Sequence, residues 1–259
     1  PTRRSSDLDN YFSRLLSLRY ELEISDNPDV LIYSVFGKTH RNYKCKRVFY
    51  SGENVAADFT VCDFAFTGDY NPDPRHYRLP LYVLYFPPER FVKPEPASGS
   101  ELMKKKGFCS FVVSNASGKV RNRFYNELSK YKQIASGGKV YNNVGYRVPD
   151  KLAFIQDYKF CISFENRSYP GYTTEKIVEA FFANTIPIYW GNPLIQREFN
   201  KDAFLSYHDF GSEKALIDRI REIDSDDELY LRYQRAPWCV QNRLGDEYQP
   251  EAVLGWLCK

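Results

Sequence analysis

Two cationic side chains stand where expected helices begin, and this placement suits the binding of phosphate. Lys176 follows a polar loop and a candidate N-cap at Thr173 or Thr174, and Arg121 lies in the first turn of an expected helix over residues 119–131. Free N–H groups and the helix dipole already favour an anion there, so a cation does not stabilise the helix itself. A phosphate-bearing ligand would account for both residues. A solvated lysine in a first turn is the alternative interpretation, and the pattern leaves it open.

The elements that would position these residues are strands that alternate with helices. Apolar runs at residues 108–114, 158–164 and 186–190 are typical of buried strands, and a loop and a helical pattern follow each of the first two. This alternation favours a parallel, doubly wound sheet. The carboxyl ends of parallel strands meet at one edge, so Arg121 and Lys176 are expected to converge on one crevice.

The length of 259 residues favours two domains. The boundaries predicted are residues 9–104 for the N-terminal domain, 105–245 for the C-terminal domain and 246–259 for a C-terminal helical segment. In the first domain a helix is predicted over residues 10–20, with strands over 20–24, 30–35, 47–50 and 64–66, and an extended segment over 78–82. A proline-containing linker is predicted over residues 86–100. Further helices are predicted over residues 150–156, 212–223, 226–235 and 250–257.

Residues 1–8, PTRRSSDL, match one reading frame of a common sequencing adapter and are interpreted as foreign to the protein. The natural sequence would then begin near Asp9, directly before the first helix. A domain with a parallel α/β sheet ordinarily starts with a strand, which precedes the first helix. The first strand of the N-terminal domain is therefore expected to be missing.

A longer motif surrounds Lys176. Phe164-Glu165-Asn166, Tyr172 and Thr174-Glu175-Lys176 follow the spacing F-E-N-x5-Y-x-T-E-K. This motif resembles the donor site of the α1,3-fucosyltransferases, and the segment 186–191, IPIYWG, is similar to the strand that follows it in bacterial members. The resemblance extends from about Tyr11 to Trp256. It implies an α/β GT-B fold, two Rossmann-like domains with parallel sheets facing a central crevice. It also implies GDP-fucose as donor and inversion at the anomeric carbon.

The resemblance also implies roles for individual residues. Arg121, Lys176 and the helix start at Thr174 would bind the diphosphate, while Asn166 and Tyr172 would line the nucleotide site. Glu175 would face the sugar, either holding fucose hydroxyls or offsetting positive charge at the anomeric carbon. The second expected domain would bind GDP-fucose and the first would bind the acceptor.

The general base is expected in the first domain. The segment 48–54, VFYSGEN, is similar to the stretch that bears the proposed base in bacterial members, which implies that role for Glu53. Glu53 also follows a predicted strand, so it lies at a carboxyl end. By pattern alone it is an ordinary solvated glutamate in a turn. Glu175 is the second catalytic candidate.

The expected reaction moves L-fucose from GDP-β-L-fucose to a GlcNAc hydroxyl of an N-acetyllactosamine-type oligosaccharide or glycoconjugate, with an α1,3 linkage. Two alternatives stay open. One is a catalytically inactive remnant that binds nucleotide or glycan, and the other is a transferase that uses a different nucleotide sugar.

The composition argues against other classes of partner and cofactor. A net charge of +3 is too small and scattered for nucleic acid. The run Lys104 to Lys106 is expected to be solvated, with at most a weak peripheral association with an anionic membrane. No cofactor and no metal site are expected, because the three histidines lack ligand spacing. The D-x-D sequence at Asp224 and Asp226 is interpreted as a helix boundary, with Asp226 as an N-cap.

The six cysteines show no paired spacing, which favours free thiols and a reducing, cytoplasmic setting. Cys109 and Cys161 fall within predicted strands. No apolar stretch reaches the length of a membrane span. Together with the family resemblance, these features imply a bacterial, cytoplasmic protein with at most a weak peripheral association with the inner membrane, or a Golgi-lumenal one if a preceding segment carries an anchor.

Overall fold

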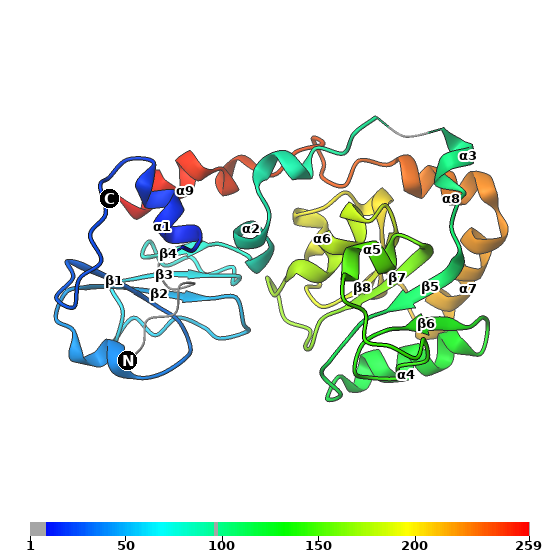
Figure 1. Ribbon diagram of the computed structural model, residues 1–259, viewed down its shortest axis with the longest axis horizontal. Coiled ribbons are helices and arrows are strands. Elements are labelled where there is room, and N and C mark those ends of the chain that lie inside the picture. The colour runs from blue at the N-terminus through cyan, green and yellow to red at the C-terminus, as the bar shows by residue number, and fades with distance from the viewer. Residues whose placement is uncertain (1–8, 96–97, 259) are drawn as a thin grey trace. The chain divides into compact units, whose positions relative to one another are not determined.

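The computed structural model describes residues 9–95 and 98–258. Residues 1–8, the presumed adapter segment, lie outside these ranges, as do residues 96–97 of the expected linker and residue 259. The described chain divides into two compact units (Figure 1). Unit 1 contains residues 9–88 and 244–258, and unit 2 contains Glu89–Arg243. The chain thus returns to the first unit after it completes the second.

Unit 1 is built on a four-stranded sheet in the order β1-β2-β3-β4, and all of its strand pairs are parallel. The strands are β1 (Val30–Tyr33), β2 (Lys46–Ser51), β3 (Phe64–Thr67) and β4 (His76–Arg78). The α-helices are α1 (Tyr11–Ser17), α2 (Leu81–Tyr85) and α9 (Pro250–Leu257). An aromatic core joins the first and last helices to the sheet. Phe66 of β3 lies with its ring centroid 5.3 Å from that of Phe12 in α1 and 5.0 Å from that of Trp256 in α9.

Two predictions for unit 1 are wrong. Residues 20–24 form no strand, although Tyr20, Leu22 and Ile24 alternate with charged residues, and all three side chains are exposed. A strand needs a neighbour to accept its hydrogen bonds, and β1 pairs only with β2 among the described strands. The segment 78–82 is not extended throughout, because β4 ends at Arg78 and α2 begins at Leu81.

Unit 2 is built on a five-stranded parallel sheet in the order β6-β5-β7-β8-β9. Its strands are β5 (Gly107–Phe111), β6 (Ile134–Ser136), β7 (Tyr158–Phe164), β8 (Ile186–Trp190) and β9 (Leu205–Ser206). Its α-helices are α3 (Gly99–Leu102), α4 (Lys119–Ser129), α5 (Lys151–Ile155), α6 (Glu175–Phe182), α7 (Glu213–Ser225) and α8 (Asp227–Arg235). The prediction of parallel, doubly wound α/β structure is confirmed. Within the described ranges, no helix has both the length and the apolar character needed to cross a bilayer.

The central strand of unit 2, β7, is covered on both faces. Phe160, Ile162 and Phe164 belong to one buried cluster that also contains residues of α4, α7 and α8. Cys161 projects to the opposite face, where it packs with Ala180 of α6. Burial on both faces explains why β7 reads as a nearly continuous apolar run. The strand therefore holds the loop after Phe164 on a rigid base.

Pro187 is the second residue of strand β8, a position where proline is uncommon. Strand β8 begins at Ile186, and Pro187 pairs in register with Cys161 of β7. Strand β9 pairs only with Ile188 and Tyr189, so Pro187 lies beyond the part of β8 that is paired on both sides. A missing N–H is tolerated at such a position.

All six cysteines are free thiols, as the sequence predicts. Cys109 in β5 and Cys161 in β7 are buried in the sheet of unit 2. Burial raises the pKa of both thiols. They therefore behave as small apolar residues of the core.

Candidate functional site

The candidate site lies in unit 2, where β5 and β7 end and the helices that follow them begin. Arg121 is the third residue of α4, and Lys176 is the second residue of α6. Both helices follow loops at the carboxyl edge of the same parallel sheet. The structure thus places the two cations at corresponding positions in two βα connections, as the sequence predicts.

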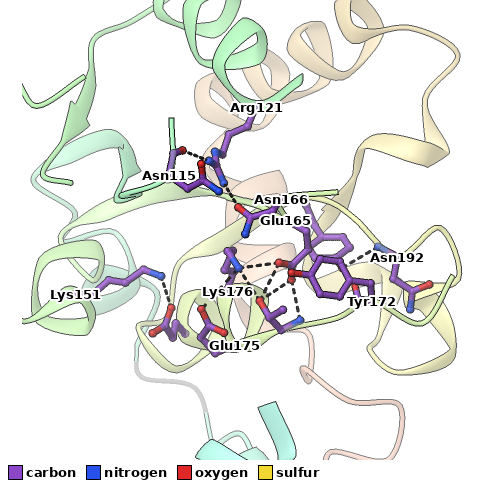
Figure 2. Close-up of polar contacts among 12 residues, drawn as sticks. Asn115, Arg121, Lys151, Glu165, Asn166, Tyr172, Glu175, Lys176 and Asn192 are labelled. Carbon is purple, nitrogen blue, oxygen red and sulfur yellow. Dashed lines mark hydrogen bonds and ion pairs between the residues drawn. The ribbon is translucent and has the colours of Figure 1, made fainter. Parts of the chain in front are cut away.

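Arg121 is buried despite its charge, with only 1% of its surface exposed. Its Nη1 donates to Asn166 Oδ1 at 3.1 Å, and its Nη2 donates to the Asn115 carbonyl at 2.5 Å (Figure 2). The Nε atom is buried and has no hydrogen-bond partner among the described residues. Burial lowers the pKa of Arg121, and the carboxylate of Glu165 opposes this shift. The side chain has unused capacity to donate hydrogen bonds to an anion.

Lys176 is held by the Glu165 carboxylate, for which the sequence pattern predicts no role. Its Nζ lies 2.8 Å from Glu165 Oε2 and 2.8 Å from Thr174 Oγ1 (Figure 2). Glu175 Oε1 is 3.7 Å from the same Nζ. Burial opposes the charged form of Lys176, but the carboxylates of Glu165 and Glu175 outweigh it and raise the pKa of the ammonium. Lys176 is therefore a fixed cation throughout the physiological pH range.

The predicted N-cap of α6 is at Thr174, but this threonine does not cap the helix with its side chain. Its backbone N–H donates to Glu165 Oε1 at 2.8 Å, and its hydroxyl lies 2.8 and 2.9 Å from the two carboxylate oxygens of Glu165. Helix α4 likewise starts at Gly118 without a side-chain cap. By contrast, side chains cap α5, α7 and α8. The two helices that carry Arg121 and Lys176 therefore start without a side-chain cap on their first-turn N–H groups, as α3 also does.

The loop between β7 and α6 is fixed by the segment after β8. Asn192 is the main link, since its Oδ1 accepts from Gly171 N at 2.9 Å and its Nδ2 donates to Thr173 Oγ1 at 3.2 Å. Tyr189 adds a second link by donating its hydroxyl to the Tyr172 carbonyl at 3.3 Å. These bonds hold the loop before α6 against β8 and the residues that follow it.

The predicted donor-site residues differ in exposure. Asn166 is exposed, Glu175 is half-buried, and Tyr172 and Thr174 are buried. Of these four, Asn166 lines a surface pocket of about 430 Å³, together with Ser117, Gly118, Lys119, Val120, Arg167, Ser168 and Trp190. The pocket joins the start of α4 to the loop after β7. The structure therefore brings Arg121, Asn166, Thr174, Glu175 and Lys176 into one region, with Tyr172 packed under the loop.

Glu53 lies in unit 1, directly after the carboxyl end of β2. Its backbone N–H donates to Ser51 Oγ at 3.1 Å, and the Ser51 hydroxyl donates to the Glu53 carbonyl at 3.1 Å. The Glu53 side chain is exposed. This turn fixes the backbone and leaves the carboxylate at the end of the sheet.

The D-x-D sequence forms the boundary between two helices. Asp226 caps α8, since its side chain accepts from Leu229 N at 3.0 Å. Asp224 is buried, lies 3.3 Å from Lys159 Nζ and also pairs with Lys132. The prediction that Asp226 is an N-cap is confirmed. Within residues 9–95 and 98–258, no three His, Cys, Asp or Glu side chains gather as a metal ion would require.

Glu165 is the residue that sequence reasoning missed. The position of Lys176 at a helix start pointed to a phosphate, but within the protein Glu165 already supplies a counter-charge at 2.8 Å. A signal was present, because a glutamate directly after a buried strand, nine residues before an N-cap threonine, can reach the helix start. Only the fold of the intervening loop brings them together.

The chain matches two family models that together cover most of its length. Residues 102–256 match the model described as glycosyltransferase family 10 (fucosyltransferase) C-term. The chain belongs to glycosyltransferase family 10. Residues 4–85 match a second model, the alpha-(1,3)-fucosyltransferase FucT N-terminal domain. The family resemblance stated from the motif is confirmed.

Relatives of this family 10 chain agree with the match. The alpha-(1,3)-fucosyltransferase FucT of Helicobacter pylori is 34% identical over 256 residues, which cover 84% of this chain and 54% of that protein. The 4-galactosyl-N-acetylglucosaminide 3-alpha-L-fucosyltransferase 9 of Mus musculus is 35% identical over 138 residues, which cover 51% of this chain and 38% of that protein. The chain spans about half, or less, of the length of the curated relatives it matches.

A solved structure is similar in fold. The crystal structure of an alpha1,3-fucosyltransferase with GDP-fucose matches with a TM-score of 0.82 and 28% identity. The match covers 98% of this chain and 86% of that one. The two parallel sheets of four and five strands thus agree with the GT-B fold of fucosyltransferases, as the resemblance implies.

Proposed function

We propose that this chain is an inverting fucosyltransferase that moves L-fucose from GDP-β-L-fucose to a GlcNAc hydroxyl of an N-acetyllactosamine-type glycan, with an α1,3 linkage. The observation that carries the proposal is the pair of cations, Arg121 and Lys176, in the first turns of two helices at one edge of the sheet. Two cations and two helix N-termini without side-chain caps suit a ligand with two phosphates. A nucleoside diphosphate sugar has this chemistry.

The names of the relatives support the choice of sugar, nucleotide and acceptor. One solved relative is described as an alpha1,3-fucosyltransferase with GDP-fucose. The Mus musculus relative is named for transfer to a 4-galactosyl-N-acetylglucosaminide. Because the chain belongs to the same family, GDP-fucose is the first donor to test. A 4-galactosyl-N-acetylglucosaminide is the first acceptor to test.

In the proposed reaction the acceptor oxygen attacks the anomeric carbon of fucose, and the bond to the β-phosphate oxygen breaks on the opposite side. Glu53 takes the proton from the acceptor hydroxyl, and GDP leaves with the bonding electron pair. Arg121 and Lys176 stabilise the charge that develops on the diphosphate. Glu175, half-buried beside Lys176, faces the sugar, and Asn166 and Tyr172 belong to the nucleotide site. Unit 2 thus binds the donor and unit 1 the acceptor.

The experiment measures transfer of radiolabelled fucose from GDP-fucose to N-acetyllactosamine, with GDP and UDP binding followed by calorimetry. The expected result is transfer, with GDP binding at least tenfold more tightly than UDP. GDP binding without transfer to any glycan would indicate an inactive binding protein. Transfer of another sugar from its own nucleotide, with none from GDP-fucose, would contradict the proposed donor.

A further inference from the structure

Glu165 is a fully buried carboxylate that the proposed reaction does not use. It directly follows β7, and none of its surface is exposed. Its backbone N–H donates to the Trp190 carbonyl at 2.7 Å, which continues the pairing of β7 with β8. The residue is therefore fixed by the sheet before its side chain makes any contact. Burying a carboxylate is unfavourable unless other groups pair with it, so the groups that contact Glu165 indicate its role.

The Glu165 carboxylate is surrounded by groups from the start of α6. Thr174 provides its backbone N–H and its hydroxyl, and Lys176 provides its ammonium, each at 2.8 Å from a carboxylate oxygen. The same Thr174 hydroxyl oxygen also accepts from Lys176 Nζ at 2.8 Å. Carboxylate, hydroxyl and ammonium thus form a closed triangle of contacts. The lysine side chain, which has four flexible bonds, is thus held in one place while 17% of it remains exposed.

Space for this carboxylate depends on Gly191, the residue after β8. A Cβ atom at Gly191 would overlap the Glu165 side chain and the Tyr189 hydroxyl. The backbone φ of Gly191 is not in the left-handed region, so the glycine is needed for room and not for its conformation. Two separate parts of the chain are therefore shaped around one buried carboxylate.

We propose that Glu165 is a positioning residue, which acts through Lys176 and fixes the ammonium and the start of α6 where the diphosphate of the donor binds. This inference rests on the proposed function. A lysine that is already ordered loses less side-chain entropy when the ligand binds. Glu165 also occupies the Thr174 hydroxyl, which leaves the first-turn N–H groups of α6 without a side-chain cap. The carboxylate therefore prepares both the cation and the helix end.

The test is a double-mutant cycle measured by GDP calorimetry on the full chain, with the parent, Glu165→Gln, Lys176→Met and the double variant. In Glu165→Gln the amide can keep one acceptor for Thr174 N but places a donor toward Lys176. The expected result is a loss of GDP affinity of about tenfold in Glu165→Gln. In the Lys176→Met background the same change should cost less than twofold, because the residue it acts through is gone.

The matched control is Glu179→Gln in α6, which removes the carboxylate that pairs with Lys151 of α5. It should change GDP affinity by less than twofold. If Glu165→Gln does not fold, Thr174→Val removes the shared hydroxyl at nearly constant shape, and its loss of GDP affinity should also vanish in the Lys176→Met background. If Glu165 and Thr174 contributed only to the stability of the fold, the loss of GDP affinity would not depend on Lys176.

The outcomes separate the two proposals. A parent that does not bind GDP would overturn the proposed function, and this inference with it. A parent that binds GDP, together with equal losses from Glu165→Gln in the presence and absence of Lys176, would overturn the positioning role alone. Unchanged affinity in Glu165→Gln would do the same.

Discussion

Arg121 and Lys176 carry the same formal charge but differ in how the protein balances it. Lys176 faces the carboxylates of Glu165 and Glu175. Arg121 donates only to uncharged oxygens, of Asn166 and Asn115, and within the described ranges it forms no ion pair. An unbalanced buried cation is costly to the folded protein. Arg121 therefore contributes more net positive charge to the site than Lys176 does.

This difference makes a prediction for Arg121→Met, in which an apolar side chain of similar length replaces the buried cation. GDP affinity should fall by about 1.5–3 kcal/mol, the usual value of a hydrogen bond to a charged group. Without ligand, the free energy of unfolding should stay equal or rise, because a buried charge is removed. Calorimetry and urea denaturation measure the two effects. Lost stability with unchanged GDP affinity would make Arg121 a structural residue.

Lys176→Met should also weaken GDP binding by about 1.5–3 kcal/mol. Because the pKa of Lys176 is raised, its ammonium stays charged well above neutral pH. The difference in GDP affinity between parent and variant should thus be the same at pH 7 and pH 9. A difference that disappears by pH 9 would contradict the charge state inferred here.

At the scale of elements, unit 2 uses two kinds of helix start. Asp150, Ser212 and Asp226 cap α5, α7 and α8 with their own side chains. Helices α4 and α6 have no such cap and carry the site cations. Capping stabilises a helix by satisfying N–H groups, and the same groups can bind an anion only when they are not capped. Helix α3 also starts without a side-chain cap, so it is the site cation together with the open helix start that distinguishes α4 and α6.

The N-cap at Asp226 tests whether side-chain capping of α8 stabilises the protein without affecting its activity. Asp226→Ala should lower the free energy of unfolding by about 1 kcal/mol, since an N-cap is lost. Asp226→Asn keeps the accepting oxygen and should retain most of that stability. Urea denaturation measures both, and turnover per folded molecule should match the parent in each. A loss of turnover in Asp226→Asn that depends on divalent cations would instead indicate that the D-x-D sequence binds a metal ion.

For the whole molecule, the proposed reaction needs residues of both units. Arg121 and Lys176 belong to unit 2, whereas Glu53 belongs to unit 1, at the end of β2. Donor binding and proton removal are therefore separable by mutation. A change at Glu53 should affect the chemical step and leave the affinity of unit 2 for GDP unchanged.

Glu53→Gln keeps the shape of the side chain and removes its basicity. Turnover should fall by ~10²–10⁴-fold, the usual contribution of a general base, while GDP affinity holds. Glu23→Gln, at another exposed glutamate of unit 1, is the matched control and should leave both unchanged. Steady-state kinetics and calorimetry measure the two quantities. Near-parental turnover in Glu53→Gln would move the base elsewhere, with Glu175 next to test.

The amino-acid sequence by itself determined the features that depend on near neighbours. Apolar periodicity located β7 and α6, and the parallel order followed from strands that alternate with helices. The Asp226 cap reaches only three residues along the chain, so it too could be predicted. The motif from Phe164 to Lys176 led to the family and to the candidate donor residues. Each of these signals lies within one short stretch of the chain.

Only the tertiary structure decided which distant groups meet. The alternation of residues 20–24 was typical of a strand, yet none of the strands in residues 9–95 and 98–258 pairs with it. Arg121 and Asn166 are 45 positions apart and meet only because β5 and β7 are adjacent in the sheet. Glu165 reaches Lys176 because the loop between them folds back on the helix start. These contacts lie in the protein interior. A polar or charged side chain there has lost its hydrogen bonds to water and must be paired with another group of the protein.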